Sequence, residues 1–220
     1  MGVVERLRAD SDAIWRKIKE HPFVVELYSG SLPLEKFKFY AIQDYNYLVA
    51  MAKCYSIMAA KADDFKVAQK VLEIAYLDAT TELESYKKLL AKLGLTLEEA
   101  VKAEVAPTNL SYTSFLISTC ALNSVLEGLI ATLPCFWSYA EIAQHHEEKL
   151  KDNRVGLYVE WAKVYLSNDY LRLVEMLKQL VEELYIEAFS YDKLSKIFKT
   201  ASRFEYMFWD MAYKMESWTV

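Results

Sequence analysis

Apolar residues recur at helical spacing along almost the whole chain of 220 residues, and this periodicity constrains the fold more than any other feature. No run of alternating apolar and polar residues is typical of a strand. Only five glycines and four prolines interrupt the pattern, which indicates few turns and long helices. Because short connections between long helices favour antiparallel neighbours, we predict an all-α, up-and-down helical bundle.

Prolines, glycines and capping residues divide this pattern into helices. The predicted spans are 3–19, 24–28, 33–60, 62–93, 96–104, 108–133, 134–150, 156–166, 170–189 and 190–215, where 134–150 either continues or restarts the preceding helix. Gly30 and Gly94 are predicted as left-handed caps, and Ser31 as the N-cap of the helix over 33–60. Without a linker, a low-complexity tract or a clear internal repeat, residues 1–220 are predicted to form a single domain.

Charge and cysteine usage exclude several classes of protein. The net charge is −5 with no basic block, which argues against nucleic acid as a partner. The charged, amphipathic N-terminal stretch is neither a signal peptide nor a membrane span. Three cysteines without a secretory leader favour a reducing compartment, so we predict a soluble, cytoplasmic protein whose partner is a small molecule.

One stretch, residues 133–139 (LPCFWSY), places Cys135 directly after a proline within a helical pattern. If a helix starts or restarts at Pro134, free N–H groups and the positive end of the helix dipole would stabilise a thiolate. Tyr139 follows at i+4, on the same helix face as the sulfur. The alternative is a small apolar packing residue beside a kink, which is the more common role of a lone cysteine.

Two carboxylates occupy positions that the periodicity turns inward. Asp44 and Glu205 each lie among aromatic residues, and Glu127 is a weaker third candidate. Each could instead be a surface charge or a structural hydrogen-bond acceptor. Together with a thiol they would suit a flat, nitrogen-containing ring: aromatic walls stack on it, an acid protonates a ring nitrogen, and a thiolate adds to an activated ring carbon.

Metal chemistry is not favoured by the histidines. His145 and His146 are adjacent, so they point about 100° apart on a helix, and they stand in a stretch that looks solvated; His21 follows a helix end. No Glu-x-x-His pair of a di-iron bundle occurs, and Cys54 and Cys120 are predicted to be packing residues. There is also no phosphate-binding glycine loop and no Gly-x-Ser-x-Gly elbow.

Six segments, spread over nearly the whole chain, resemble the TenA/thiaminase II family. They are residues 21–24 (HPFV), 43–48 (QDYNYL), 107–114 (PTNLSYTS), 133–139 (LPCFWSY), 158–165 (YVEWAKVY) and 205–213 (EYMFWDMAY). Each is weak alone, but all occur in order. The resemblance implies a haem-oxygenase-like bundle without metal or bound cofactor, usually a homotetramer. It also implies an aminopyrimidine aminohydrolase that replaces the amine of 4-amino-5-aminomethyl-2-methylpyrimidine, or the thiazole of thiamin, by water.

The resemblance also implies roles for individual residues. Cys135 would be the nucleophile that adds to the pyrimidine, and Glu205 the acid at a ring nitrogen. Asp44 would hold the amino edge of the pyrimidine and help to ionise the thiol. The walls of the site would be Tyr47, Tyr112, Tyr139, Tyr165 and Phe208.

Two other functions remain open on the same fold. A non-catalytic carrier of thiamin or of a pyrimidine could use the same aromatic residues. A haem or di-iron oxygenase is disfavoured by the poor placement of the histidines. Members of the family have been linked to transcriptional control, but the acidic sequence predicts no DNA-binding surface.

Overall fold

A computed structural model describes residues 2–77, 79–80 and 83–220, and within these ranges it contains helices and no strands. The predicted all-α class is therefore confirmed. The chain divides into two compact units. Unit 1 combines the N-terminal segment up to Leu32 with Leu129–Asp210, and unit 2 combines Pro33–Gly128 with Met211–Val220.

Unit 1 packs the N-terminal helices against later helices of the chain around an aromatic core. Its elements are α1 (Val3–Asp10), α2 (Asp12–Lys19), α3 (Pro22–Ser29), most of α9 (Val125–His146), the 3₁₀ helix η2 (Glu147–Lys151), α10 (Gly156–Val164), α11 (Asn168–Leu184) and most of α12 (Tyr191–Lys214). In the core, the Trp15 ring lies 5.9 Å from Phe198 and 5.3 Å from Trp137. The Trp15 indole N–H donates to Ser202 Oγ at 3.0 Å, so its polar atom is satisfied.

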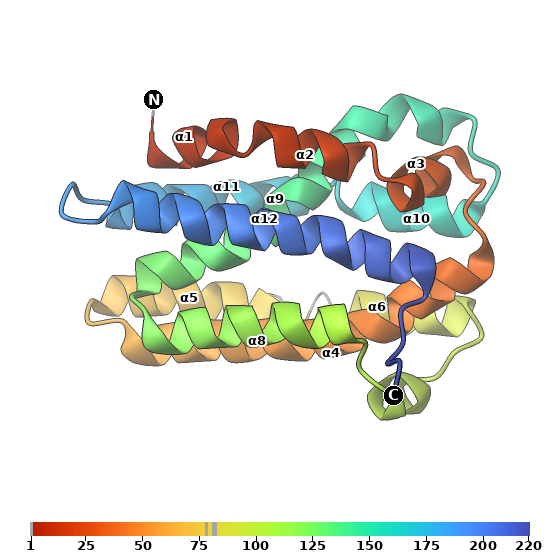
Figure 1. The fold of residues 1–220 in the computed structure, drawn as a ribbon, viewed down its shortest axis with the longest axis horizontal. Helices are drawn as coiled ribbons and strands as arrows, with labels where there is room; N and C mark the ends of the chain where they lie inside the picture. The colour runs from red at the N-terminus through yellow and green to blue at the C-terminus, as the bar shows by residue number, and fades with distance from the viewer. Residues whose placement is uncertain (1, 78, 81–82) are drawn as a thin grey trace. The chain divides into compact units, whose positions relative to one another are not determined.

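Unit 2 is built on the long helix α4. Its elements are α4 (Leu34–Lys61), α5 (Phe65–Leu77), α6 (Leu83–Lys92), α7 (Leu97–Lys102) and α8 (Pro107–Leu122), with a C-terminal tail after α12. Helices α5 and α8 both pack against α4, and α4 and α8 lie side by side (Figure 1). The tail is fastened to α8, since Glu216 accepts hydrogen bonds from Thr108 N at 2.9 Å and Thr108 Oγ1 at 3.1 Å.

The predicted caps have different outcomes. Gly30 ends α3 with φ 82°, and Gly94 follows α6 with φ 70°, so both glycines adopt the predicted left-handed conformation. Ser31 is not the N-cap of α4: that position is Pro33, without a side-chain bond. The Ser31 N–H instead donates to Glu26 O at 2.8 Å, closing the turn that ends α3.

Three predicted helices are interrupted. The span 3–19 breaks at Ser11, where the hydroxyl donates back to Leu7 O at 2.9 Å and competes with the helical ladder. The span 62–93 comprises α5 and α6, and Asp64 Oδ1 caps α5 through the N–H groups of Lys66 and Val67; residues 78 and 81–82 of this span lie outside the described part. The span 108–133 breaks at Asn123. The last three predicted helices agree with α10, α11 and α12 to within five residues at each end.

Candidate active site

Unit 1 brings together five of the eight predicted site residues. Cys135 and Tyr139 lie one turn apart on α9, Glu205 and Phe208 lie on α12, and Tyr165 follows α10. Cys135 is half-buried, as a nucleophile that must meet a substrate requires, whereas Glu205 is only 3% exposed. Burial of a carboxyl group costs free energy unless hydrogen bonds compensate for it, and buried carboxyl groups often act as acids in active sites.

Ser138 connects Glu205 to the helical turn that carries Cys135. Its hydroxyl lies 3.4 Å from Glu205 Oε2 and 3.4 Å from Cys135 O, and Ser138 is itself buried. A hydroxyl has one proton, so it donates to one of these oxygens at a time. Ser138 was not predicted as a site residue; its position three residues after Cys135, on the same helix face, is the signal that could have found it.

An aromatic cluster surrounds Tyr139. Its ring centroid lies 4.9 Å from that of Tyr165 and 5.0 Å from that of Trp209, and Trp161 lies 4.8 Å from Tyr165. These separations are those of favourable offset and edge-to-face pairs. The predicted pair Tyr139 and Tyr165 is thus in contact, while the two tryptophans are additions that the sequence did not single out as site residues.

The other three predicted residues lie in unit 2. Tyr47 on α4 donates from its hydroxyl to the Tyr112 hydroxyl on α8 at 3.5 Å, and the two rings are 5.3 Å apart. Asp44 is half-buried, one turn before Tyr47. Burial raises the pKa of the Tyr86 phenol above its usual value, and the charge of Asp44 raises it further, so Asp44 lies within electrostatic reach of Tyr86.

Gln43, the neighbour of Asp44, fixes the position of α8 on α4. Its side-chain amide donates to Glu104 O at 2.9 Å, and its side-chain oxygen accepts from Ala106 N at 3.0 Å. Asn109 Nδ2 completes the network by donating to Gln43 O at 2.7 Å and to Gln43 Oε1 at 3.1 Å. The network sets the register in which Tyr112, one turn after Asn109, meets Tyr47.

We expect Gln43→Ala to lower the free energy of unfolding by about 2–4 kcal/mol, because it leaves a buried backbone N–H and the Asn109 amide without their side-chain acceptor. Urea denaturation measures this loss. Gln144→Ala on α9 is the matched control, since Gln144 is exposed and its removal should change the unfolding free energy by less than about 0.5 kcal/mol. Equal losses in the two variants would contradict the role assigned to Gln43.

Helix α9 does not begin at Pro134, so a helix N-terminus does not explain how the Cys135 thiolate would be stabilised. Helix α9 begins at Val125 and runs through Pro134 to His146, so no helix starts at Pro134. The true start is capped by Ser124 and Glu127: Glu127 Oε2 accepts from Ser124 N at 2.8 Å and from Ser124 Oγ at 2.7 Å. Cys135 lies deep in the helix, so the dipole of a helix N-terminus does not act on its thiol. Glu127, 6% exposed, forms this capping box.

One of the three histidines lies in a different environment from the one that the sequence predicted. His146 is buried rather than solvated: its Nε2 donates to Lys19 O at 2.8 Å, and burial lowers its pKa to about 4. His21 caps α3, where its Nδ1 accepts from Phe23 N at 3.1 Å. In the described ranges, no three His, Cys, Asp or Glu side chains are grouped so that they could hold a metal ion. Cys54 and Cys120 are buried, as predicted for packing residues.

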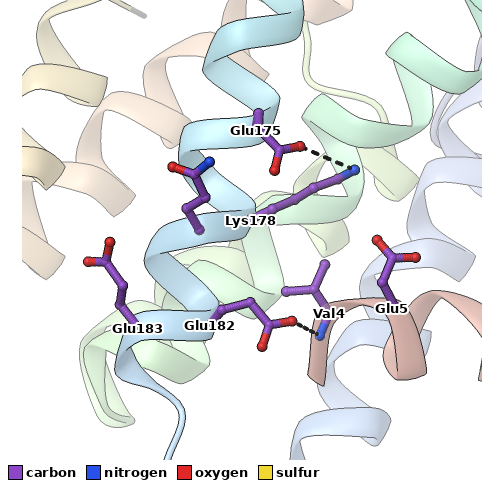
Figure 2. A pocket seen from close by; sticks show the side chains of 7 residues that line it. Val4, Glu5, Glu175, Lys178, Glu182 and Glu183 are labelled. Atoms are coloured by element: carbon purple, nitrogen blue, oxygen red, sulfur yellow. Dashed lines mark hydrogen bonds and ion pairs between the residues drawn. The ribbon is translucent and has the colours of Figure 1, made fainter. Parts of the chain in front are cut away.

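A separate pocket of about 300 Å³ lies between α1 and α11 in unit 1, and it contains no predicted site residue. Figure 2 shows Glu182 reaching the backbone of Val4 and Lys178 pointing toward Glu175. The Glu182 carboxylate accepts from Val3 N at 3.1 Å and from Val4 N at 2.8 Å, while Lys178 Nζ lies 3.9 Å from Glu175 Oε2. Glu182 therefore caps the start of α1 and fastens it to α11. The residues that line this pocket are Val4, Glu5, Glu175, Lys178, Gln179, Glu182 and Glu183.

Helix length and hydropathy bear on membrane insertion. Over the part of the chain that the structure describes, every helix is too short or too polar to cross a bilayer.

Comparison with known proteins covers both units. The sequence model of the TENA/THI-4/PQQC family matches residues 8–215. The chain is 32% identical over 220 residues to the aminopyrimidine aminohydrolase of Halalkalibacterium halodurans, covering 99% of this chain and 98% of that protein. A TenA homologue from P. horikoshii OT3 has a solved structure that superposes with a TM-score of 0.93 at 48% identity, covering 97% of this chain and 99% of that one.

The fold also extends to a more distant protein. A domain from Shewanella denitrificans with a haem-oxygenase-like fold superposes with a TM-score of 0.80 at 15% identity, covering 96% of this chain and 92% of that domain. At this identity the likeness concerns the fold alone, and it confirms the predicted haem-oxygenase-like bundle. The match of residues 8–215 to the family model and the 32% identity over the full chain show that this chain belongs to the TENA/THI-4/PQQC family.

Proposed function

We propose that this protein is an aminopyrimidine aminohydrolase of thiamin salvage or degradation. It replaces the amine of 4-amino-5-aminomethyl-2-methylpyrimidine, or the thiazole of thiamin, by water. The observation that carries the proposal is the identity of 32% over 220 residues to a protein named aminopyrimidine aminohydrolase. The contact of Glu205 with Ser138, one turn from Cys135, supports it, because it places an acid beside the helix that carries the only half-buried cysteine in the described ranges.

The proposed reaction uses the thiol of Cys135 as nucleophile and the carboxyl of Glu205 as acid. Glu205 protonates a ring nitrogen, and Cys135 Sγ forms a bond to a ring carbon that this protonation has made electrophilic. The bond from the methylene carbon to the leaving group then breaks, and the amine takes the electron pair and the proton that the thiol gave up, so that it departs as ammonia. Water adds to the exposed methylene and gives one proton to the sulfur as the carbon–sulfur bond breaks, and the ring returns its proton to Glu205. The net change is one water consumed and one amine released.

The remaining residues hold the substrate in this proposal. Asp44 accepts hydrogen bonds from the amino edge of the pyrimidine. The aromatic walls are Tyr47, Tyr112, Tyr139, Tyr165 and Phe208. Residues 1–220 act as a single domain in this proposal, and the match of the family model to residues 8–215 supports it. The protein acts in the cytoplasm, as a homotetramer.

The test is turnover of the two substrates by the purified protein. We expect ammonia and the hydroxymethyl pyrimidine from the aminomethyl pyrimidine, and free thiazole from thiamin, in amounts far above the protein concentration. Multiple turnovers are required, because a carrier binds its ligand and releases it unchanged. Tight binding of either compound without product after long incubation would contradict the proposal and favour the carrier.

A further inference from the structure

Tyr170 connects α11 to the helical turn that carries Cys135. Its hydroxyl donates to the backbone carbonyl of Phe136, the residue after Cys135, at 3.1 Å. Tyr170 and Phe136 are both buried, so a carbonyl that lost this donor would not readily find water in its place. The two rings also pack together, with centroids 6.4 Å apart and planes 29° apart. Tyr170 thus holds the α9 backbone next to the proposed nucleophile by one polar and one apolar contact.

The ring of Tyr170 also supports the aromatic cluster of the candidate site. Its centroid lies 5.0 Å from that of Tyr165 with the planes at 88°, which is edge-to-face packing. Tyr165 in turn lies 4.9 Å from Tyr139, which follows Cys135 by one turn on α9. Tyr170 therefore contacts both the turn of Cys135 and a residue of the proposed wall, and a shift of Tyr170 would disturb both.

The junction of α10 and α11 fixes the position of Tyr170 itself. Tyr170 lies in the first turn of α11, where its N–H donates to Oγ of the N-cap residue Ser167 at 3.2 Å. The Ser167 hydroxyl donates to Val164 O, at the end of α10, at 2.7 Å. One serine thus fastens the end of α10 to the start of α11, and Tyr165 and Tyr170 stand at the two ends of this connection. A residue held in this way can restrict the groups that it contacts.

We propose that Tyr170 is a positioning residue for the reaction: its hydroxyl holds the turn of Cys135, and its ring holds Tyr165. The inference rests on the proposed function, because it assigns Tyr170 to the same reaction. Pro134 lies inside α9 and has no N–H to donate to the carbonyl one turn back, so the helical ladder is interrupted one residue before the nucleophile. Helices bend at such interruptions. The bond from Tyr170, one residue after Cys135, restricts this bend from a neighbouring helix.

Two hydroxyls reach consecutive carbonyls of this turn. Ser138 Oγ lies 3.4 Å from Cys135 O, and Tyr170 donates to Phe136 O at 3.1 Å. Successive carbonyls of a helix point about 100° apart around its axis, so the turn is restrained from two directions. A misplacement of a reacting group by about 1 Å can lower a rate by about 10²-fold. Restraint of the turn that carries the nucleophile therefore has a direct effect on kcat.

Tyr170→Phe removes the hydroxyl and keeps the ring. We expect kcat to fall about five- to twentyfold with KM unchanged, since the nucleophile loses alignment while the wall remains. Tyr170→Leu removes the ring as well, so KM should also rise, by about three- to tenfold. The matched control is Tyr158→Phe: the Tyr158 hydroxyl is buried and donates to Leu32 O at 2.8 Å, and neither residue belongs to the candidate site. The control should lower the melting temperature about as much as Tyr170→Phe and leave kcat unchanged.

A second readout needs no substrate. Alkylation by iodoacetamide reports access to the Cys135 thiol, because Cys54 and Cys120 are buried. In Tyr170→Phe, Cys135 should be alkylated at least threefold faster than in the wild type, since a less restrained turn exposes the sulfur more often. Tyr158→Phe should be alkylated at the wild-type rate. Timed labelling followed by peptide mass spectrometry measures the rate at each cysteine. Faster alkylation together with slower turnover is the signature of lost positioning.

Two outcomes would overturn the inference. Tyr170→Phe with unchanged kcat and unchanged alkylation, but a lower melting temperature, would make Tyr170 a residue of the fold alone. Equal effects of Tyr158→Phe on kcat and alkylation would attribute the change to lost stability rather than to the turn of Cys135. A wild type without turnover would contradict the proposed function, and the alkylation rates would still decide whether Tyr170 restrains this turn.

Discussion

Replacement of Cys135 by alanine is expected to lower kcat for both pyrimidine substrates by about 10³-fold or more, which corresponds to about 4 kcal/mol of lost transition-state stabilisation. In the proposed reaction this variant lacks the sulfur that would form the covalent bond to the ring, and the methyl group of alanine cannot act as a nucleophile. Since Cys135 is half-buried and alanine suits a helix interior, the melting temperature should change little. The measurement is steady-state release of ammonia, together with thermal unfolding.

The control for Cys135 is another cysteine of the same chain. Cys54→Ala removes a fully buried thiol from α4, so it is expected to cost stability through the small cavity that it leaves, with no loss of kcat. Mass spectrometry of the wild type quenched during turnover should show an adduct on the peptide that contains Cys135. Full activity of Cys135→Ala would exclude covalent catalysis by this thiol.

Replacement of Glu205 by glutamine is expected to lower kcat by about 10²- to 10⁴-fold, the usual range for the loss of a general acid. Glutamine matches the shape of glutamate and can still accept the bond from Ser138, but it cannot give a proton to a ring nitrogen and take it back. The fold should therefore persist while the reaction slows. The pH–rate profile of the variant should lack the limb that titration of this acid produces in the wild type.

Two further variants distinguish the proposed acid role of Glu205 from effects of burial and hydrogen bonding. Glu127→Gln changes a second buried glutamate, which caps α9, so it should reduce stability and leave kcat unchanged. Ser138→Ala removes the hydroxyl that contacts Glu205; at 3.4 Å this bond is long, so we expect a fall in kcat of about three- to tenfold with KM unchanged. If Glu205→Gln were no slower than Ser138→Ala, Glu205 would not be the acid.

Local chemistry allowed much of the fold to be predicted. Gly30 and Gly94 end helices, as predicted, because the left-handed conformation there favours glycine. Helix α3 begins at Pro22, two residues before the predicted span 24–28, because the missing N–H of proline costs nothing in a first turn. The periodicity also predicted the burial of Glu205, which is 3% exposed. These features depend on residues a few positions apart, whose interactions are set by helix geometry alone.

Features that depend on distant contacts were predicted less well. Nothing local to Asn123 required the break before α9, and the capping box of Ser124 and Glu127 starts that helix nine residues before Pro134. The stretch around His146 looked solvated because its neighbours are polar. Its ring is nevertheless buried, and it donates a hydrogen bond to Lys19 O, 127 residues earlier in the chain. The hydroxyl of Ser138 has a meaning only because α12 places Glu205 beside it.

The sequence by itself determined the helical class, most helix ends and the residue types of the candidate site, because helix periodicity, caps and side-chain chemistry are written in neighbouring residues. Only the tertiary structure decided that Ser138 accompanies Glu205, that Gln43 and Asn109 set the register of α8, and that Tyr170 contacts the backbone beside Cys135. Each of these depends on which surfaces the packed helices cover, and a spacing pattern contains no information about which neighbour covers which face.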